Sequence, residues 1–256
     1  MRTLIEGAQS LGLTLSPQEI SAFQIYQQEL LEWNTRFNLT AIDDEEHIQF
    51  RHFLDSLSCL LGIEGSYTSR EPFGRGARRI SDAARQRSSK VIDVGTGPGF
   101  PGIPLKIVCP ALKLTLLEAT GKKVQFLRHI VSRLNLREVD VVHGRAEELG
   151  QMREHREGYD LVLARAVAVL PVLAEYTLPL CRPGGQVVAQ KGPDVQAEVL
   201  GAERAISILG GRLRRLVEVE LPGLAESRTL VVIDKVARTP DNYPRRPGIP
   251  RKRPLR

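Results

Sequence analysis

The sequence has little cysteine, few aromatic residues and no long apolar run. Its three cysteines, Cys59, Cys109 and Cys181, lie far apart and form no CxxC pair. This excludes a disulfide framework and a cysteine-based zinc site, and it predicts a reduced, cytoplasmic protein. No apolar run reaches the ~18 residues of a membrane span, and the first residues have no apolar signal-peptide core, so we expect no membrane contact.

Several catalytic motifs are also missing. The sequence has no GxxxxGK(S/T) phosphate loop, no GxSxG elbow and no HExxH pair. These absences argue against P-loop NTPases, serine hydrolases of the GxSxG type and zinc proteases. The five histidines show no metal-ligand spacing, so we expect no metal. His52 and Asp55 stand three positions apart, and we expect a structural contact there that lines a site rather than a catalytic pair.

Positive charge is concentrated in two segments. The 256 residues carry a net charge of +6, and 42% are apolar, which suits one large domain or a domain with a small appendage. Residues 237–256 hold seven basic residues and one acid, and residues 62–90 hold seven basic and three acidic residues. From charge alone, a polyanionic partner and a solubilising role explain these segments equally well.

Residues 1–61 are predicted to form an N-terminal helical subdomain. Residues 16–19 (SPQE) are a capping box with proline at the first helical position. The apolar residues that follow recur at spacings of three and four: Ile20, Phe23, Tyr26, Leu30, Trp33 and Phe37. A second helix is expected from Asp43 or Asp44 onward, with these residues buried: Phe50, Phe53, Leu57, Leu60 and Leu61. Residues 62–90 have no periodicity and are predicted to be a basic flexible insert.

Residues 91–236 alternate between apolar β-type runs and helical stretches, which predicts a parallel sheet with crossover helices. Strands are expected near 91–94, 113–118, 138–143, 159–164 and 185–190, and helices near 100–109, 121–135, 169–180 and 193–209. Two further strands, 212–221 and 228–236, follow without an intervening helix and should pair antiparallel at one edge. Such a mostly parallel seven-stranded sheet is typical of a class I, Rossmann-like, S-adenosylmethionine-dependent methyltransferase domain. Residues 237–256 remain as a basic C-terminal tail.

A glycine-rich segment, VIDVGTGPGFPG, spans residues 91–102. Its glycines permit positive φ and let a ligand approach the backbone closely. Asp93 lies two positions before Gly95, and this acid-x-Gly-x-Gly-x-Gly pattern resembles motif I of S-adenosylmethionine-dependent methyltransferases. The segment also matches the dinucleotide fingerprint formally, and a tight turn without a ligand is the structural alternative.

Glu118 ends the second predicted strand, 23 positions after Gly95. An acid at roughly this distance beyond a glycine loop is placed to accept hydrogen bonds from ribose hydroxyl groups. NAD enzymes and methyltransferases share this feature, so it does not choose between them. An exposed strand-end glutamate without a ligand is the alternative.

Cations follow four neighbouring strands at the edge where open α/β sheets bind ligands. They are Lys122 and Lys123, Arg145, Arg165 and Lys191. Lys122 opens a helix where the dipole disfavours positive charge, and Arg165 is a charge within an apolar stretch. Pairing with Glu118, Glu147 and Glu148 would explain one or two of these cations. Cations at four strand ends together favour a large anionic substrate, and the mixture of arginine and lysine suits phosphate.

Further segments extend the glycine motif: 38–42 (NLTAI), 51–57 (RHFLDSL), 93–104 (DVGTGPGFPGIP), 121–123 (GKK), 145–148 (RAEE), 164–166 (ARA), 191–192 (KG) and 243–250 (YPRRPGIP). With these segments the chain resembles the bacterial 16S ribosomal RNA guanine-N7 methyltransferases of the RsmG type, also called glucose-inhibited division protein B. The resemblance covers nearly the whole chain except the insert at 62–90.

The resemblance implies S-adenosylmethionine as cofactor and 16S ribosomal RNA, or the small ribosomal subunit, as partner. We expect a monomer. It implies cofactor contacts from Gly95, Thr96, Gly97, Gly99, Phe100, Glu118, Ala119, Thr120, Ala146, Glu147 and Arg165. It implies catalytic roles for Arg165, Lys191 and Lys122. The RNA contacts that it implies are Lys122, Arg145, Lys191, Asn38, His52, Arg245 and Arg246.

Methylation at guanine N7 agrees with the lack of a convincing general base in the sequence, because N7 carries a lone pair and no proton. The protein then has to align the reacting atoms and exclude water. Two rival hypotheses stay open: a NAD-dependent oxidoreductase, which shares the glycines and Glu118, and a non-catalytic RNA-binding protein on the same scaffold. A thermal shift with S-adenosylhomocysteine, compared with NADH, separates the three.

Overall fold

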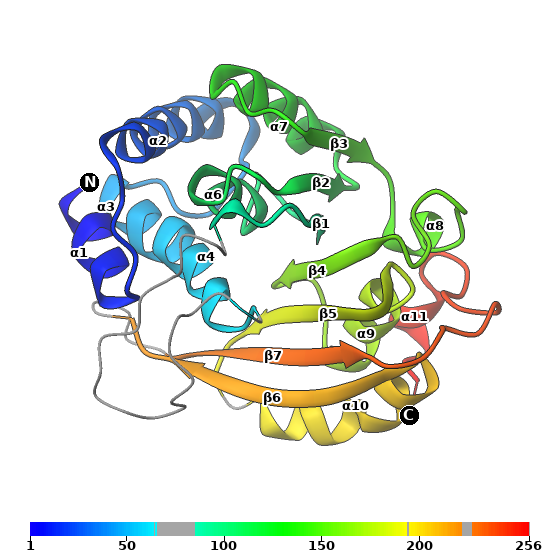
Figure 1. Cartoon of the computed structure of the whole chain (residues 1–256). Helices are drawn as coiled ribbons and strands as arrows, with labels where there is room; N and C mark the ends of the chain where they lie inside the picture. The colour runs from blue at the N-terminus through cyan, green and yellow to red at the C-terminus, as the bar shows by residue number, and fades with distance from the viewer. Residues whose placement is uncertain (64, 66–84, 194, 222–226, 256) are drawn as a thin grey trace.

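The structure, a computed structural model, describes residues 1–63, 65, 85–193, 195–221 and 227–255. Its centre is a seven-stranded sheet in the order β3-β2-β1-β4-β5-β7-β6. The strands are β1 (Lys90–Val94), β2 (Lys113–Glu118), β3 (Val139–His143), β4 (Tyr159–Arg165), β5 (Cys181–Lys191), β6 (Gly211–Val219) and β7 (Arg228–Lys235). The first five pair in parallel, and β7 pairs antiparallel with both β5 and β6 (Figure 1). The predicted class I methyltransferase sheet with its antiparallel edge pair is confirmed.

Side chains of the central strands alternate between two cores, one on each face of the sheet. In β1, Val91 belongs to the core shared with the N-terminal helices, whereas Ile92 and Val94 belong to the core on the other face. In β4, Leu163 and Val162 divide in the same way. Because both faces are covered, these strands read as continuous apolar runs, which is why the sequence pattern located them well.

The first face is covered by α1 (Arg2–Ser10), α2 (Pro17–Phe37), α3 (Glu45–Ile48), α4 (Asp55–Leu57), α6 (Gly102–Val108) and α7 (Gly121–Arg133). Helix α2 begins with the predicted capping box, in which Ser16 Oγ accepts from the Glu19 N–H at 3.3 Å and Glu19 Oε2 accepts from the Ser16 N–H at 2.7 Å. Phe23, Tyr26 and Leu30 of its apolar stripe are fully buried.

The second predicted helix is interrupted. Between α3 and α4 the chain forms a π-helical segment, η1 (Gln49–Leu54), and after α4 it continues as a 3-10 segment, η2 (Ser58–Leu61). The wider π turn changes the direction in which the following side chains point, and such turns are frequent at functional sites. His52 lies inside this turn and Asp55 directly after it, and both are buried.

The second face is covered by α8 (Ala146–Leu149), α9 (Leu170–Thr177), α10 (Gln196–Ile208) and α11 (Ile249–Lys252). The sequence pattern predicts neither α8 nor α11, which are four residues each. In Figure 1, α8, α9 and α11 gather on the side of the sheet away from the N-terminal helices.

The structure covers two of the predicted segments, 62–90 and 237–256, to different extents. Most of the predicted insert 62–90 lies outside the described residues. Residues 237–255, which the sequence suggested as a tail, lie against the body: Tyr243 and Leu255 pack on the second core. In the described part of the chain, no helix is long and apolar enough to cross a membrane.

Candidate active site

The loop between β1 and α6 turns back onto the end of β2. The main-chain N–H groups of Gly95 and Thr96 donate to the Leu117 carbonyl at 2.9 and 3.1 Å. Gly95, Gly97 and Gly99 have φ values of 67°, 62° and 112°, which residues with side chains rarely adopt. Among the described residues, nothing lies closer than 4.0 Å to the place that a Cβ of Gly97 would occupy. The main chain there is open to a ligand.

Asp93 ties the two ends of this loop together. Its Oδ2 accepts from Thr96 Oγ1–H at 2.6 Å and from the Gly102 N–H at 2.8 Å. The carboxyl group is fully buried, and this burial raises the pKa of Asp93 to about 6. Its Oδ1 has no hydrogen-bond partner within the described chain. A buried acceptor of this kind fits a site completed by a ligand or an ordered water.

Glu118 holds the loop from the end of β2. Its Oε2 accepts from the Gly97 N–H at 2.9 Å, and its Oε1 accepts from the Thr120 N–H at 2.8 Å. Each carboxylate oxygen can accept a second hydrogen bond, so the group can still receive ribose hydroxyls. The neighbouring Ala119 carbonyl accepts from His143 Nε2 at 3.0 Å, which fixes the connection between β2 and β3. The residues present therefore fit a nucleoside cofactor.

Arg165, at the end of β4, lies at the centre of a buried cluster. Its guanidinium donates to Asp55 Oδ2 at 2.8 Å, to the Arg51 carbonyl at 3.1 Å and to His52 Nδ1 at 3.3 Å. It also lies 5.1 Å above the centre of the Phe100 ring, within the range of a cation–π contact. The charge of Arg165, which lies within an apolar stretch, is thus balanced by partners from the N-terminal helices. The sequence alone does not identify these partners.

His52 links Arg165 to the glycine loop. Its ring stacks on the Phe100 ring with centroids 4.4 Å apart. Burial, together with the charge of Arg165, lowers the pKa of His52 to about 3. Because Arg165 donates to Nδ1, the proton of the neutral ring lies on Nε2, which donates to Thr40 Oγ1 at 2.8 Å. His52 is therefore neutral near pH 7, with both ring nitrogens engaged.

Asp55 collects donors from three elements. Besides Arg165, it accepts from Gln190 Nε2 at Oδ1 (3.0 Å) and at its own carbonyl (2.6 Å), and it pairs with Arg228 at 3.4 Å. The expected contact between His52 and Asp55 is replaced by their shared partner, Arg165. Sequence reasoning missed Gln190 and Arg228. The predicted antiparallel strand 228–236 was the available signal for Arg228, because the first residue of a strand that pairs antiparallel with β5 lies beside the last residues of β5.

The turn that leaves β4 joins this cluster to the glycine loop. Ala166 has a φ of 54°, which residues with a Cβ seldom adopt and which is often found at functional sites. The next side chain, Val167, lies 2.9 Å from the position that a Cβ of Gly95 would take. A larger residue at Gly95 would push the two halves of the site apart.

A cavity of about 360 Å³ opens beside the cluster. It is lined by Ile42, Arg51, His52, Asp55, Arg165, Ala166, Gln190, Lys191, Gly192 and Arg228. Lys191 pairs with Glu198 at 2.8 Å and donates to the Ala168 carbonyl at 2.9 Å. Four cationic side chains and one carboxylate line the cavity, so it suits an anionic group.

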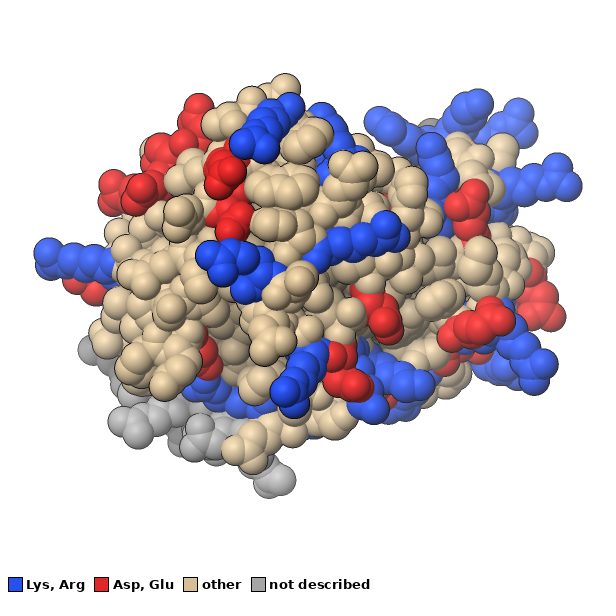
Figure 2. Space-filling view, turned by 90° about the horizontal axis from the view of Figure 1, so that it is seen from above, with Lys and Arg blue, Asp and Glu red and all other residues tan. Residues whose placement is uncertain are grey.

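Three other predicted cations lie at the surface of the same sheet edge. Lys122 and Arg145 are exposed and Lys123 is half-buried; none of them forms an ion pair with a described residue. The acids proposed as alternative partners accept main-chain N–H groups instead, from Gly97 and Thr120 at Glu118, Gly248 at Glu147 and Arg145 at Glu148. Figure 2 shows lysine and arginine side chains gathered at the end of the molecule where Figure 1 places α8 and α11.

Helix α8 carries two predicted cofactor residues after β3. Ala146 and Glu147 are both buried. The Glu147 carboxylate accepts from the Gly248 N–H at 3.0 Å. Burial raises the pKa of Tyr176 in α9, and the nearby charge of Glu147 raises it further. The Glu147 side chain is thus engaged with the C-terminal segment.

The remaining predicted RNA residues are separated from the cavity. Asn38 ends α2 in a left-handed conformation, is exposed and does not line the cavity. Arg245 is half-buried, and its guanidinium pairs with the fully buried Glu175 at 2.6 Å, which ties this part of the chain to α9. Its neighbour Arg246 is exposed. No group of three or more possible metal ligands occurs among the residues that the structure describes.

Comparison with known proteins identifies the family. The model of the GidB family, described as rRNA small subunit methyltransferase G, matches residues 19–70 and 78–230. Three relatives that carry the name ribosomal RNA small subunit methyltransferase G align over almost their whole length. The protein of Roseiflexus sp. (strain RS-1) is 49% identical over 100% of both chains. That of Alkaliphilus metalliredigens (strain QYMF) is 44% identical over 99% of this chain and 98% of its own, and that of Dehalococcoides mccartyi (strain CBDB1) is 43% identical over 100% of both. The chain therefore belongs to the rRNA small subunit methyltransferase G family.

Proposed function

We propose that the chain methylates N7 of a guanine in 16S ribosomal RNA of the small ribosomal subunit, in the cytoplasm. Its family membership makes it an S-adenosylmethionine-dependent rRNA methyltransferase; the base and the atom are the proposal. The observation that carries it is the direct contact between the glycine loop and the cation-lined cavity, through Phe100, His52 and Arg165. A cofactor loop and an anion-binding pocket that share a wall are what methyl transfer to RNA requires.

The glycine loop and the two strand ends beside it would hold the cofactor. Gly95, Thr96, Gly97, Gly99 and Phe100 supply the loop, Glu118, Ala119 and Thr120 follow β2, Ala146 and Glu147 follow β3, and Arg165 ends β4. The carboxylate of Glu118 would accept from the ribose. When bound, S-adenosylmethionine supplies a methyl group activated by the adjacent sulfonium.

Transfer to N7 asks for position and not for a base. The histidine of the cavity, His52, is neutral, is hydrogen-bonded through both nitrogens and faces Arg165, so it is not poised to take a proton. We infer that Arg165 and Lys191 orient the target nucleotide and its phosphates, and that the closed stack of His52 on Phe100 excludes water from one side.

The exposed cations would extend the RNA contact beyond the cavity. Lys122 and Arg145 stand at the same sheet edge with no ion-pair partner in the described chain, and Arg246 faces solvent. Such contacts add affinity that depends on salt and not on base sequence. Asn38, at the end of α2, and His52, in η1, would contact the RNA from the N-terminal helices.

The test uses small subunits and naked 16S RNA prepared from cells that lack the gene. The purified chain is incubated with each substrate and S-adenosylmethionine, and the RNA is then cleaved chemically at N7-methylguanine and mapped by primer extension. One new cleavage site that appears only with active enzyme supports the proposal. Methyl incorporation without cleavage at a guanine would move the methyl group to another atom or base.

A further inference from the structure

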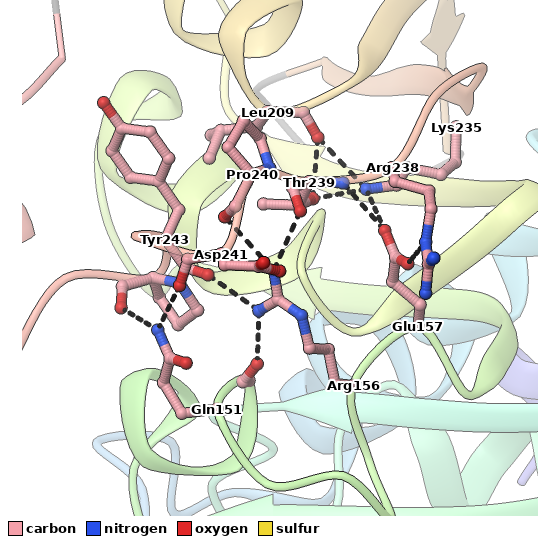
Figure 3. A network of polar contacts seen from close by, with 12 residues as sticks. Gln151, Arg156, Glu157, Leu209, Lys235, Arg238, Thr239, Pro240, Asp241 and Tyr243 are labelled. Carbon is pink, nitrogen blue, oxygen red and sulfur yellow. Dashed lines mark hydrogen bonds and ion pairs between the residues drawn. The ribbon is translucent and has the colours of Figure 1, made fainter.

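The residues after β7 form a strap across the second face of the sheet. We define this C-terminal strap as residues 237–255; it passes α9 and α8 and ends with α11. Figure 3 shows its first half, where Thr239, Pro240 and Tyr243 surround the side chain of Arg156. The strap therefore has an inner side that is bonded to the body and an outer side that carries exposed cations, among them Arg246 and Lys252.

Arg156 joins the strap to the end of α8. Its guanidinium donates to strap carbonyls of Tyr243 at 2.7 Å, Thr239 at 2.8 Å and Pro240 at 3.1 Å. The same group donates to the carbonyl of Gly150, the residue that ends α8, at 2.8 Å. One largely buried side chain thus fixes the distance between the strap and this helix.

Three more contacts bring the strap onto α8 and the two residues that follow it. Gln151 Nε2 donates to the Pro244 carbonyl at 2.8 Å, and a Cβ on Gly150 would come within 2.7 Å of the Pro244 ring. At the other end of α8, the Gly248 N–H donates to Glu147 Oε1 at 3.0 Å. The strap therefore contacts both ends of a helix that is only four residues long.

The strap itself is anchored at two places away from α8. Arg245 donates to the fully buried Glu175 through its main chain and its guanidinium, at 2.8 and 2.6 Å. The Thr239 N–H donates to Glu157 at 2.7 Å, and Glu157 also pairs with the buried Lys235 at 3.2 Å. These anchors make the strap a fixed support and not a loose tail.

We propose that the C-terminal strap is a positioning element of the cofactor site, acting through α8. This inference rests on the proposed function, in which Ala146 and Glu147 contact the cofactor. A helix of one turn has almost no stability of its own and depends on its tertiary contacts. The strap supplies those contacts on the outer side of α8, so removing them lets the segment after β3 move and weakens cofactor binding without touching Arg165 or the cavity.

The experiment compares affinities for S-adenosylhomocysteine, measured by calorimetry on purified proteins. One pair of chains ends at Pro247 or at Arg253; only the shorter one loses the Gly248 N–H and α11. A second pair is Arg156→Ala and Arg238→Ala. Both arginines lie at the same corner of the structure, but Arg238 belongs to the strap, is exposed and pairs with Glu157, and no described hydrogen bond or ion pair joins it to α8.

The chain ending at Pro247 and the Arg156→Ala variant are expected to bind S-adenosylhomocysteine about tenfold more weakly, which corresponds to one charge-assisted hydrogen bond. The chain ending at Arg253 and Arg238→Ala bind as the full chain does. In turnover, the KM for S-adenosylmethionine rises while kcat changes little. The truncation at Pro247 combined with Arg156→Ala should weaken the affinity for S-adenosylhomocysteine by less than the product of the two separate fold-changes, because both changes release the same helix.

Equal affinity in the full chain and the chain ending at Pro247 would overturn the role of the strap. Loss of kcat without a change in affinity would overturn it as well, because it would indicate an effect on chemistry or folding. The chain ending at Pro247 keeps the Arg156 and Arg245 anchors, so it tests the idea even if Arg156→Ala does not fold. If the full chain binds S-adenosylhomocysteine but methylates no guanine N7, the proposed base is wrong and the strap result still stands.

Discussion

Arg165 and Arg245 form similar ion pairs on the two sides of the sheet. Arg165 lies 2.8 Å from Asp55 on the side of the N-terminal helices, and Arg245 lies 2.6 Å from Glu175 on the side of α9. Both carboxylates are buried. Around Arg165, three further cations face one carboxylate across an open cavity. Around Arg245, the nearby Arg156 donates its hydrogen bonds to main-chain carbonyls, and the exposed cations of the same segment do not face a shared cavity among the described pockets.

This difference shows that the partners of a basic residue, and not its position in a basic segment, indicate its role. A cluster that keeps excess positive charge beside a cavity can receive an anion, because part of its charge is not neutralised within the protein. A cluster whose donors all end on carboxylates and carbonyls is closed and holds two pieces of chain together. Substitution of a residue in the first arrangement should have a large effect on activity, and substitution of a residue in the second should have a large effect on stability.

The largest effect is expected from Arg165→Ala and Lys191→Ala. We expect each to lower the rate of methyl transfer by about 100-fold or more, as when one preorganised charge is removed from an active site. The fold should survive Arg165→Ala because Asp55 keeps Gln190 and Arg228 as partners. The measurement is methyl incorporation into small subunits at saturating cofactor, with thermal unfolding as the control. Near-full activity in both variants would remove their assigned roles.

The next effect concerns stability and uses two adjacent arginines. Arg245→Ala leaves the fully buried Glu175 without its guanidinium and should cost about 3 kcal/mol of unfolding free energy. Arg246→Ala changes an exposed side chain and should leave the unfolding free energy unchanged. Urea unfolding of the two variants measures both values. Equal stability would mean that the Arg245 pair is not a closed anchor, and the comparison with Arg165 would fail.

Much of the fold could be predicted because local pattern and tertiary environment agree there. The buried strands are continuous apolar runs, and the glycines of the β1–α6 loop mark a turn that only they can form. The missed elements lack a local signal: α8 and α11 are too short for a helical period, and η1 depends on packing around His52. The first part of β5 contains Pro183 and Gly184, and the predicted strand began only near residue 185.

The sequence predicts the parts of the candidate site that belong to a local motif or to the end of a predicted strand. These are the glycine loop, Glu118 and the strand-end cations, which lie at one end of the parallel strands. It does not predict side-chain contacts between segments that are distant in the sequence. The partners of Arg165 come from η1 and α4, and those of Asp55 come also from β5 and β7, so only the folded chain brings Asp55, Gln190 and Arg228 together. At Arg245 the sequence shows the charge but not the buried Glu175 that pairs with it.

Two titrations near Arg165 should change stability in opposite directions with pH. The pKa of His52 is lowered to about 3 from an ordinary value near 6.5, so its contribution is complete above about pH 6.5 and is lost as pH falls toward 3. The pKa of Asp93 is raised to about 6 from an ordinary value near 3.9, so the folded chain gains stability from a proton that it loses as pH rises from about 4 to 6. Each slope is at most about 1.4 kcal/mol per pH unit.

Unfolding free energies of the native chain, His52→Asn and Asp93→Asn between pH 4.5 and 6 check these signs. Relative to the native chain, His52→Asn should gain stability as pH falls, because it lacks a group that protonates only on unfolding. Asp93→Asn should gain relative stability as pH rises, because it cannot ionise inside the protein. The same sign for both variants would contradict the burial of one of the two groups.

The smallest effect is expected from the exposed cations. Lys122→Ala should weaken RNA binding modestly and lower the slope of log affinity against log salt by about 1, because one phosphate contact is lost. Arg246→Ala should act in the same way, whereas Arg245→Ala, measured where it is still folded, should leave the slope unchanged. Arg182→Ala is the matched control, because Arg182 pairs with Asp160 at 2.6 Å at the opposite end of β5. Filter binding to 16S RNA at several salt concentrations gives the four slopes. A reduced slope for Arg245→Ala would show that its guanidinium reaches RNA despite Glu175, and that a closed ion pair can open when a stronger anion arrives.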